Sequence, residues 1–176
     1  DTSPTSRDAV SKAEVEFRRR QQQGLALIRQ WIPGCENAFI ARTSPSLCVR
    51  RGRLITCDYN IELDDILEGR HFEDDVMAYA FHDCAPRLLV KDGGTYGIPY
   101  RALRVAGLDN LLCAGMMITR DWEAHMSTRN TVSCMGQGQA TGTAAALCAQ
   151  KECTTRELPY NELREALLAG GVILEN

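Results

Sequence analysis

The residues MGQGQATGTAAA, at positions 135–146, carry the most information about the fold of this 176-residue chain. If the stretch forms a helix, Gly138, Gly142 and Ala146 lie on one face, because they are four residues apart. A glycine inside a helix costs about 1 kcal/mol relative to alanine, so two on one face need a physical reason. Close approach of a backbone or a ligand would supply that reason. We therefore predict a helix over residues 131–150 whose glycine face is closely covered.

The N-terminus of this helix falls near Arg129, Asn130 and Thr131. The first backbone N–H groups of a helix have no partner within it, and the helix dipole is positive there. Such an end suits an anion or an electron-rich cofactor carbonyl. An alanine-rich packing helix explains the same pattern. A dinucleotide-binding turn at Gly136 and Gly138 fits less well, because no convincing strand precedes or follows it.

Composition argues against several classes of protein. The chain has 20 Lys and Arg and 23 Asp and Glu, a net charge of −3, so we expect no nucleic-acid partner. No apolar run approaches the roughly 20 residues of a membrane span, so we expect no membrane partner. The eight cysteines form no CxxC pair, and the three histidines, His71, His82 and His125, share no i,i+4 spacing. We predict no metal site, and cysteines kept reduced in the cytoplasm.

Helix signals occur at both ends of the chain. Ser11 to Glu14 is a capping box that predicts the start of a helix ending before Pro33 and Gly34. The Arg and Gln runs at 18–23 indicate a solvated helix face, although an anion-binding face is an alternative. Residues 160–169 predict a last helix, stopped by Gly170 and Gly171.

Between these helices the pattern is mostly typical of strands. The stretches expected to be extended are 38–41, 53–56, 76–81, 96–105 and 110–115, the last as a core strand of a sheet. Residues 64–69 predict a helical turn closed by Gly69, residues 91–94 a turn, and 119–127 a polar loop. The expected fold class is mixed α/β.

Four motifs in order resemble the C-terminal part of the FAD-dependent oxidoreductase family with the glutathione-reductase-like flavin fold. They are YGIPYRAL at 96–103, NLLCAG at 110–115, Ser127 with Arg129, and GQATGTAAAL at 138–147. Upstream, VRRGRLI at 49–55 and DILEGR at 65–70 are similar to further family stretches, so the resemblance runs from about residue 13 to 168. It implies three parts: an N-terminal helix (1–34), a partial substrate domain, mostly strands (35–105), and the C-terminal part of an FAD-binding domain (106–176).

The departures from the family concern both single residues and a whole unit. Met116 stands where the family has an arginine, and Thr141 replaces an alanine. The family also begins with a strand–GxGxxG–helix unit that holds the FAD pyrophosphate, and these 176 residues contain none. The resemblance thus implies a C-terminal fragment, inactive and poor at binding FAD without its N-terminal dinucleotide-binding half, which would be its partner.

The resemblance also suggests site residues. The expected cofactor-binding residues are Ala114, Gly115, Arg129, Asn130, Thr131, Gly138 and Gln139. Arg51 and Arg101 are candidates for binding a substrate carboxylate, because a guanidinium matches it bidentately, although solvated charges explain them equally. His82 and His125 are candidates for proton transfer beside the flavin, and Tyr100 for donation to a substrate oxygen; structural roles are the alternative for each.

The reaction implied is hydride transfer between a small organic substrate and FAD, in which the cofactor performs the chemistry and the protein supplies binding and electrostatics. A function of another class is a non-catalytic association module that docks through the Gly138, Gly142 and Ala146 face. Both the fragment and the association module predict self-association of an isolated chain, for instance as a homodimer, because a half-domain without its other half exposes apolar surface.

Overall fold

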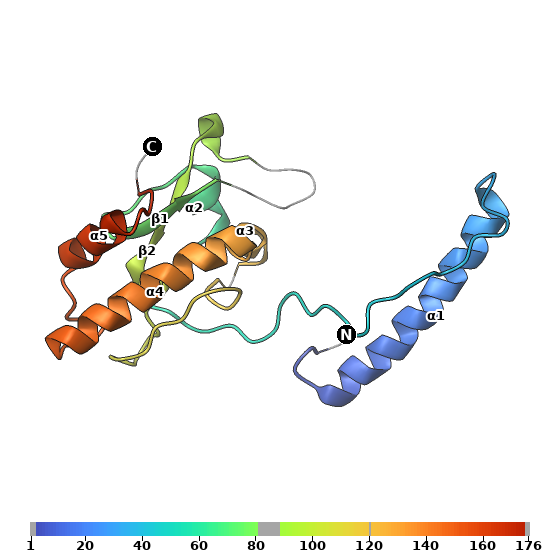
Figure 1. Cartoon of the computed structure of the whole chain (residues 1–176), viewed down its shortest axis with the longest axis horizontal. Coiled ribbons are helices and arrows are strands. Elements are labelled where there is room, and N and C mark those ends of the chain that lie inside the picture. The colour runs from blue at the N-terminus through green and yellow to red at the C-terminus, as the bar shows by residue number, and fades with distance from the viewer. Residues whose placement is uncertain (1–2, 81–88, 120, 175–176) are drawn as a thin grey trace. The chain divides into compact units, whose positions relative to one another are not determined.

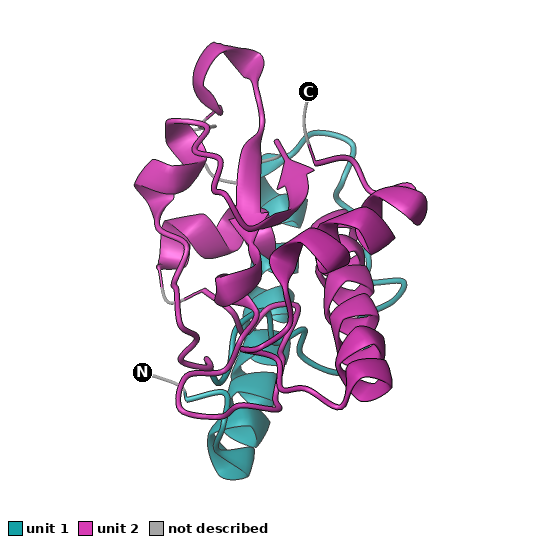
Figure 2. Ribbon diagram, turned by 90° about the vertical axis from the view of Figure 1, so that its left-hand side faces the viewer, with its two compact units in different colours: residues 1–53 teal, residues 54–176 magenta. Residues whose placement is uncertain are grey.

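The structure is a computed structural model that describes residues 3–80, 89–119 and 121–174. The chain divides into two compact units, residues 1–53 and residues 54–176 (Figure 2). Together they hold helices and a small two-stranded sheet, which confirms the mixed α and β composition. Among the described residues, no helix is both long and apolar enough to cross a bilayer.

The first unit is one helix and the segment that follows it. Helix α1 spans Arg7–Trp31 and begins at Ser6, whose side chain accepts a hydrogen bond from the Ala9 N–H at 3.3 Å. The capping box predicted at Ser11 is therefore wrong, because Ser6 provides an earlier cap. The end before Pro33 is confirmed, since Ile32 is extended.

The strand predicted at 38–41 is wrong, because helix side chains, rather than a second strand, bond this part of the backbone. Arg29 Nε donates to the Ala38 carbonyl at 2.6 Å, and Glu14 accepts from the Leu47 N–H at 2.9 Å. No residue of α1 is buried within the structure.

The second unit is built around an antiparallel pair of strands (Figure 1). Strand β1 spans Asp75–Tyr79 and β2 spans Tyr96–Pro99, with Met77 opposite Ile98 and Tyr79 opposite Tyr96. The prediction of a strand at 76–81 holds through Tyr79, while residues 81–88 lie outside the described part. The extended stretch predicted at 96–105 ends early, because a 3₁₀ turn follows at Tyr100–Ala102.

Four helices cover this hairpin or flank it: α2 (Leu63–Leu67), α3 (Trp122–Thr128), α4 (Thr131–Lys151) and α5 (Tyr160–Ala169). Helix α4 packs on β1 and on α5, and α2 contacts β2. The predictions of α4 and α5 are confirmed, as is the helical turn closed by Gly69, whose φ is +63°.

Three further predictions are wrong. Residues 110–115 form no strand, because Leu112 alone bridges to Arg104 and Leu111 is 46% exposed. Residues 119–127 are not a loop throughout, because the Asp121 carboxylate accepts from the Glu123 N–H at 2.8 Å and starts α3. The strand expected at 53–56 is also wrong, because the bridge formed in this part of the described chain is the one between Cys57 and Val105, just outside that range.

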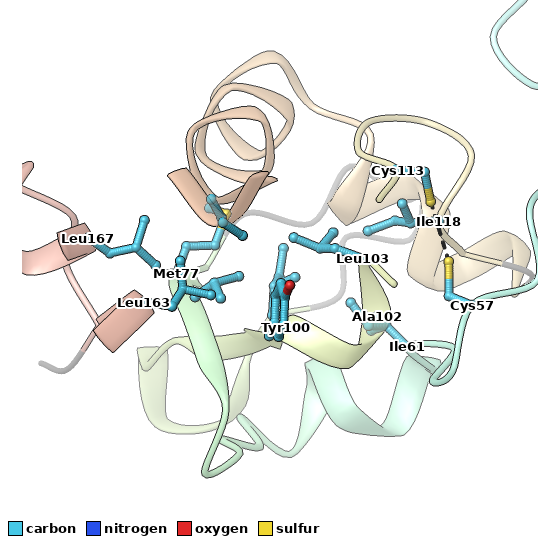
Figure 3. Packing of buried hydrophobic residues seen from close by; sticks show 14 of the residues in the cluster. Cys57, Ile61, Met77, Tyr100, Ala102, Leu103, Cys113, Ile118, Leu163 and Leu167 are labelled. Carbon is cyan, nitrogen blue, oxygen red and sulfur yellow. Dashed lines mark hydrogen bonds between the residues drawn. The ribbon is translucent and has the colours of Figure 1, made fainter. Parts of the chain in front are cut away.

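The core of the second unit lies where the hairpin meets α4 and α5. Figure 3 shows Met77, Leu163 and Leu167 converging from β1 and α5, with Tyr100 and Leu103 beside them. Apolar side chains removed from water in this way supply most of the driving force for folding.

One glycine in β2 is required by a buried carboxylate. A Cβ added to Gly97 would lie 1.8 Å from Asp75 Oδ2 and 2.1 Å from Asp75 Cγ. Asp75 is only 5% exposed, and its Oδ2 is held by His71 and by the Phe72 N–H, so a displaced carboxylate would lose these hydrogen bonds. Gly97 thus couples the hairpin to the placement of Asp75.

We predict that G97A lowers the free energy of unfolding by at least about 2 kcal/mol, because the new methyl group overpacks the hairpin. The control is G142A on α4, where a Cβ would meet nothing within 4 Å. This control is expected to raise stability by up to about 1 kcal/mol through chain entropy. Urea unfolding measures both, and a G97A variant as stable as the parent would contradict the assignment.

Candidate functional site

The N-terminus of α4 offers unused backbone donors. Asn130 occupies the N-cap position, but its side chain makes no capping hydrogen bond. Its Nδ2 instead donates backwards, to the carbonyls of Met126 at 3.1 Å and Ser127 at 2.9 Å. The first turn contains no acidic residue. Within the described residues, the first N–H groups of α4, from Thr131 onward, therefore lie at the positive end of the helix dipole without a capping side chain.

One buried side chain connects this helix end to the loop at residues 115–119, which we call the Gly115 loop. Gln137 is fully buried, and its Oε1 accepts from the Gly115 N–H at 2.7 Å. Its Nε2 donates to the Thr128 carbonyl and to Ser133 Oγ, both at 3.0 Å. Gly115 has a φ of +93°, which favours glycine. The amide of Gln137 thus joins the Gly115 loop to the corner between α3 and α4.

The far end of the same loop is also held. Thr119 Oγ1 lies 3.0 Å from Thr128 Oγ1, and both residues are buried. Ser127 Oγ lies 2.6 Å from the hydroxyl of Tyr96, so the corner is tied to β2 as well. Hydrogen bonds therefore hold both ends of the loop and the N-terminus of α4 in fixed positions relative to one another. A preorganised binding site requires such support.

The glycine face of α4 is open rather than covered. Gly138 and Gly142 have nothing within 4 Å of an added Cβ, and both line a groove of about 450 Å³ with Leu111 and Thr141. Gly136 is the glycine approached most closely in α4, with Met77 Sδ 2.7 Å from its added Cβ. Gln139 is exposed and donates to the Gly170 carbonyl at 3.3 Å. The predicted close cover of Gly138 and Gly142 is therefore not provided by the described residues of this chain, and cover by a missing unit stays a prediction.

The structure places two proposed catalytic residues inside the second unit. His125 is 1% exposed and stacks on Trp122 with ring centroids 6.0 Å apart. Tyr100 is 3% exposed, and its hydroxyl donates to the Thr155 carbonyl at 3.0 Å. Burial raises the pKa of Tyr100, which makes its hydroxyl a weaker proton donor. The third proposed residue, His82, lies outside the described residues.

The proposed substrate arginines lie in different units. Arg101 forms an ion pair with Asp74, and its guanidinium lies 4.9 Å from the ring centroids of both Tyr59 and Phe72. Arg51 is half-buried in the first unit. Within the second unit, the contacts described for Arg101 are to Asp74, Tyr59 and Phe72 and not to the α4 N-terminus. Of the proposed cofactor residues, the structure joins Gly115, through Gln137, to the corner between α3 and α4, which contains Arg129, Asn130 and Thr131.

A second polar cluster was not singled out from the sequence. His71 Nδ1 lies 2.9 Å from Asp75 Oδ2, and its Nε2 lies 3.2 Å from the Thr95 carbonyl. Nε2 also lies 3.1 Å from the Thr95 hydroxyl, which donates or accepts, so the contacts suit a hydrogen on either ring nitrogen. Both residues line a cavity of about 520 Å³ with Tyr160 and Arg164. The i,i+4 spacing of His71 and Asp75 was the available signal.

Burial is the main cause that raises the pKa of Asp75, to about 6, against lowering by hydrogen bonds from Phe72 and His71. Asp75 Oδ1 is buried without a hydrogen-bond partner among the described residues. The protonated carboxyl is therefore favoured in the folded state relative to the unfolded chain.

A family model described as FAD dependent oxidoreductase matches residues 1–167. The chain belongs to the FAD-dependent oxidoreductase family, as the four motifs predicted. No match is found among curated proteins or among solved structures.

We predict that Asp75 makes stability fall as pH rises. Between the unfolded pKa near 4 and the folded pKa of about 6, the folded state binds the proton and the unfolded state does not. The contribution is present below the unfolded pKa and lost through about pH 6, by about 3 kcal/mol. Urea unfolding of the parent and of D75N from pH 4 to 7.5 measures the difference, and parallel pH profiles would contradict it.

A further prediction concerns Gln137. Q137L leaves the Gly115 N–H and the Thr128 carbonyl without their partner, so stability should fall by at least about 2 kcal/mol. The control is Q139A two residues on, an exposed amide with one long bond, expected to change stability by less than about 0.5 kcal/mol. Equal effects of the two substitutions in urea unfolding would show that Gln137 does not hold the loop.

Proposed function

We propose that this chain is the C-terminal portion of a flavoprotein oxidoreductase with the glutathione-reductase-like fold. The observation that carries the proposal is the uncapped N-terminus of α4, joined through Gln137 to the left-handed Gly115. The family match over residues 1–167 supports FAD as the group that such a site would take. An N-terminal dinucleotide-binding unit would complete the site by holding the pyrophosphate.

The residues present fit a flavin. The N–H groups of Thr131 and Val132 would donate to the electron-rich carbonyl edge of the ring, and the helix dipole would favour negative charge there. Gly115, beside Ala114, would let the chain pass close to the cofactor without a Cβ. When bound, FAD supplies hydride transfer to or from a small organic substrate.

The open glycine face supports the proposal of a missing partner. Gly138 and Gly142 would allow the N-terminal unit to approach α4 closely, which explains two glycines in a helix interior. The chain alone would then bind FAD poorly and be inactive. Its cytoplasmic location stays a prediction from the cysteines.

The residues that act on the substrate stay predictions. Arg51 is retained as a candidate for substrate binding, and His82 and His125 as candidates for proton transfer. His125 is 1% exposed, so a substrate would have to displace the side chains that cover it. Arg101 and Tyr100 would need to give up existing partners to reach a substrate, since each already makes a polar contact within the second unit.

The groove along Gly138 and Gly142 also favours a second candidate, a non-catalytic module that associates through this face, for instance as a homodimer. The two candidates differ in what fills the groove. A dinucleotide-binding unit brings flavin with it, whereas an association partner does not.

The test is a visible absorbance spectrum of the chain after incubation with FAD and desalting, alone and together with a strand–GxGxxG–helix unit. We expect a colourless chain alone and a perturbed flavin band with the unit present. A chain that retains flavin unaided would contradict the need for a partner. A dimer without flavin under both conditions would favour association.

In the flavin-loaded protein, T131D should weaken FAD binding by up to about tenfold, because a carboxylate in the first turn competes for the N–H groups and repels negative charge. Q150E is the matched control, since it adds the same charge near the other end of α4 at an exposed position. Flavin fluorescence titration measures both, and equal affinities would remove the helix N-terminus from the site.

A further inference from the structure

Two pairs of thiols lie close together in the second unit, and none of the described cysteines forms a disulfide. Cys57 Sγ lies 3.4 Å from Cys113 Sγ, and Figure 3 shows the two side chains pointing toward one another. Cys148 and Cys153 form the other pair at the end of α4, where the Cys153 N–H donates to the Cys148 carbonyl and the Cys148 thiol donates to the Thr154 carbonyl at 3.6 Å. The backbone around each pair decides whether a disulfide is able to form.

The backbone holds Cys57 and Cys113 too far apart for a disulfide. Cys57 bridges to Val105, while the Cys113 N–H donates to the Leu103 carbonyl at 2.8 Å. The two cysteines therefore flank the same central segment from opposite sides. Two strand spacings of about 4.8 Å each put their Cα atoms about 9 Å apart. This is near the limit that the 3.4 Å contact of the two sulfurs allows, with the side chains pointing straight at one another. A disulfide needs Cα atoms within about 7 Å, so this pair would have to displace its backbone.

The backbone brings Cys148 and Cys153 together. The Cys153 N–H donates to the Cys148 carbonyl at 3.1 Å, and Glu152 between them is left-handed with φ 54°. This is the Schellman closure of a helix, in which the residues that flank the turn normally make an apolar contact. The hydrogen bond and standard covalent geometry limit the two Cα atoms to at most about 7 Å. That limit coincides with the range that disulfides span.

The second pair is also reachable. Cys148 and Cys153 line the groove of about 450 Å³ that runs along Gly138 and Gly142. Cys153 is half-buried, whereas Cys148 is 8% exposed. Because Cys153 is the more exposed of the two thiols, it is the one that a hydroperoxide reaches first.

We propose that Cys148 and Cys153 form an oxidisable dithiol that a hydroperoxide converts to an intramolecular disulfide, while Cys57 and Cys113 stay reduced. The Cys153 thiolate attacks one peroxide oxygen, the O–O bond breaks, and a sulfenic acid and a water form. Cys148 sulfur then attacks Cys153 sulfur, the S–O bond breaks, and the second water leaves with the thiol proton. Two thiols are oxidised to one disulfide and hydrogen peroxide is reduced to two waters.

The disulfide would fix one wall of the groove. Thr155, two residues after Cys153, bonds the Asp109 carbonyl through its N–H at 2.8 Å and its hydroxyl at 2.9 Å. A cross-link at the end of α4 therefore holds the helix to the segment that leads to Leu111 on the other side of the groove. The inference concerns thiol chemistry alone and does not depend on the proposed flavin site.

The experiment uses the 176-residue chain with C35S, C48S, C84S and C134S, treated with hydrogen peroxide and then with a thiol-blocking reagent. Trypsin separates the four sulfurs, because residues 54–70, 105–120, 130–151 and 152–156 are distinct peptides. We expect a peptide pair joining 130–151 to 152–156, lighter by two hydrogens and split by dithiothreitol. It should exceed any pair joining 54–70 to 105–120 by at least about tenfold, because only the first satisfies disulfide geometry.

The matched variants are C153S, which should abolish the cross-link, and C57S, which should leave it unchanged. Separate sulfinic or sulfonic acids on Cys148 and Cys153, without a cross-link, would overturn the proposal. A dominant Cys57–Cys113 cross-link would overturn it as well, since the backbone separation argued above would then be wrong.

Discussion

The buried amide of Gln137 is the interaction on which the candidate site depends. It satisfies the Gly115 N–H on one side and the Thr128 carbonyl and Ser133 hydroxyl on the other. A buried polar side chain is stable only when its hydrogen bonds are made, so the loop and the helix end cannot move independently without leaving groups unsatisfied. The position of the Gly115 loop is thereby set by the start of α4.

The candidate site combines this rigid support with an uncapped N-terminus of α4. Asn130 turns its side chain toward α3, so the residue type most suited to cap α4 leaves the first turn uncapped. Proteins normally satisfy such donors with a side chain, water or a ligand. Membership in a flavin-dependent family gives the ligand class that we propose, and the open Gly138 and Gly142 face gives the side from which a partner would approach.

Local signals predicted the elements that local interactions determine. Alanine content and periodicity located α4, and Gly170 with Gly171 ended α5, because both depend on nearby residues. The segment 110–115 reads as a core strand, but strand formation needs a neighbour that the sequence pattern does not reveal. The site was predicted in part: Gly115 and Asn130 followed from a resemblance, whereas the role of Gln137 depends on contacts across 22 residues.

The most direct measurement of the central claim is an amide NMR titration of the ¹⁵N-labelled chain with FAD, extended to high cofactor concentration to detect weak binding. The account predicts that the backbone signals of Gly115, Thr131 and Val132 shift together, with smaller changes along the rest of α4. Shifts confined to other regions, such as the His71 and Asp75 cavity, would contradict the assignment of the α4 N-terminus as the flavin site.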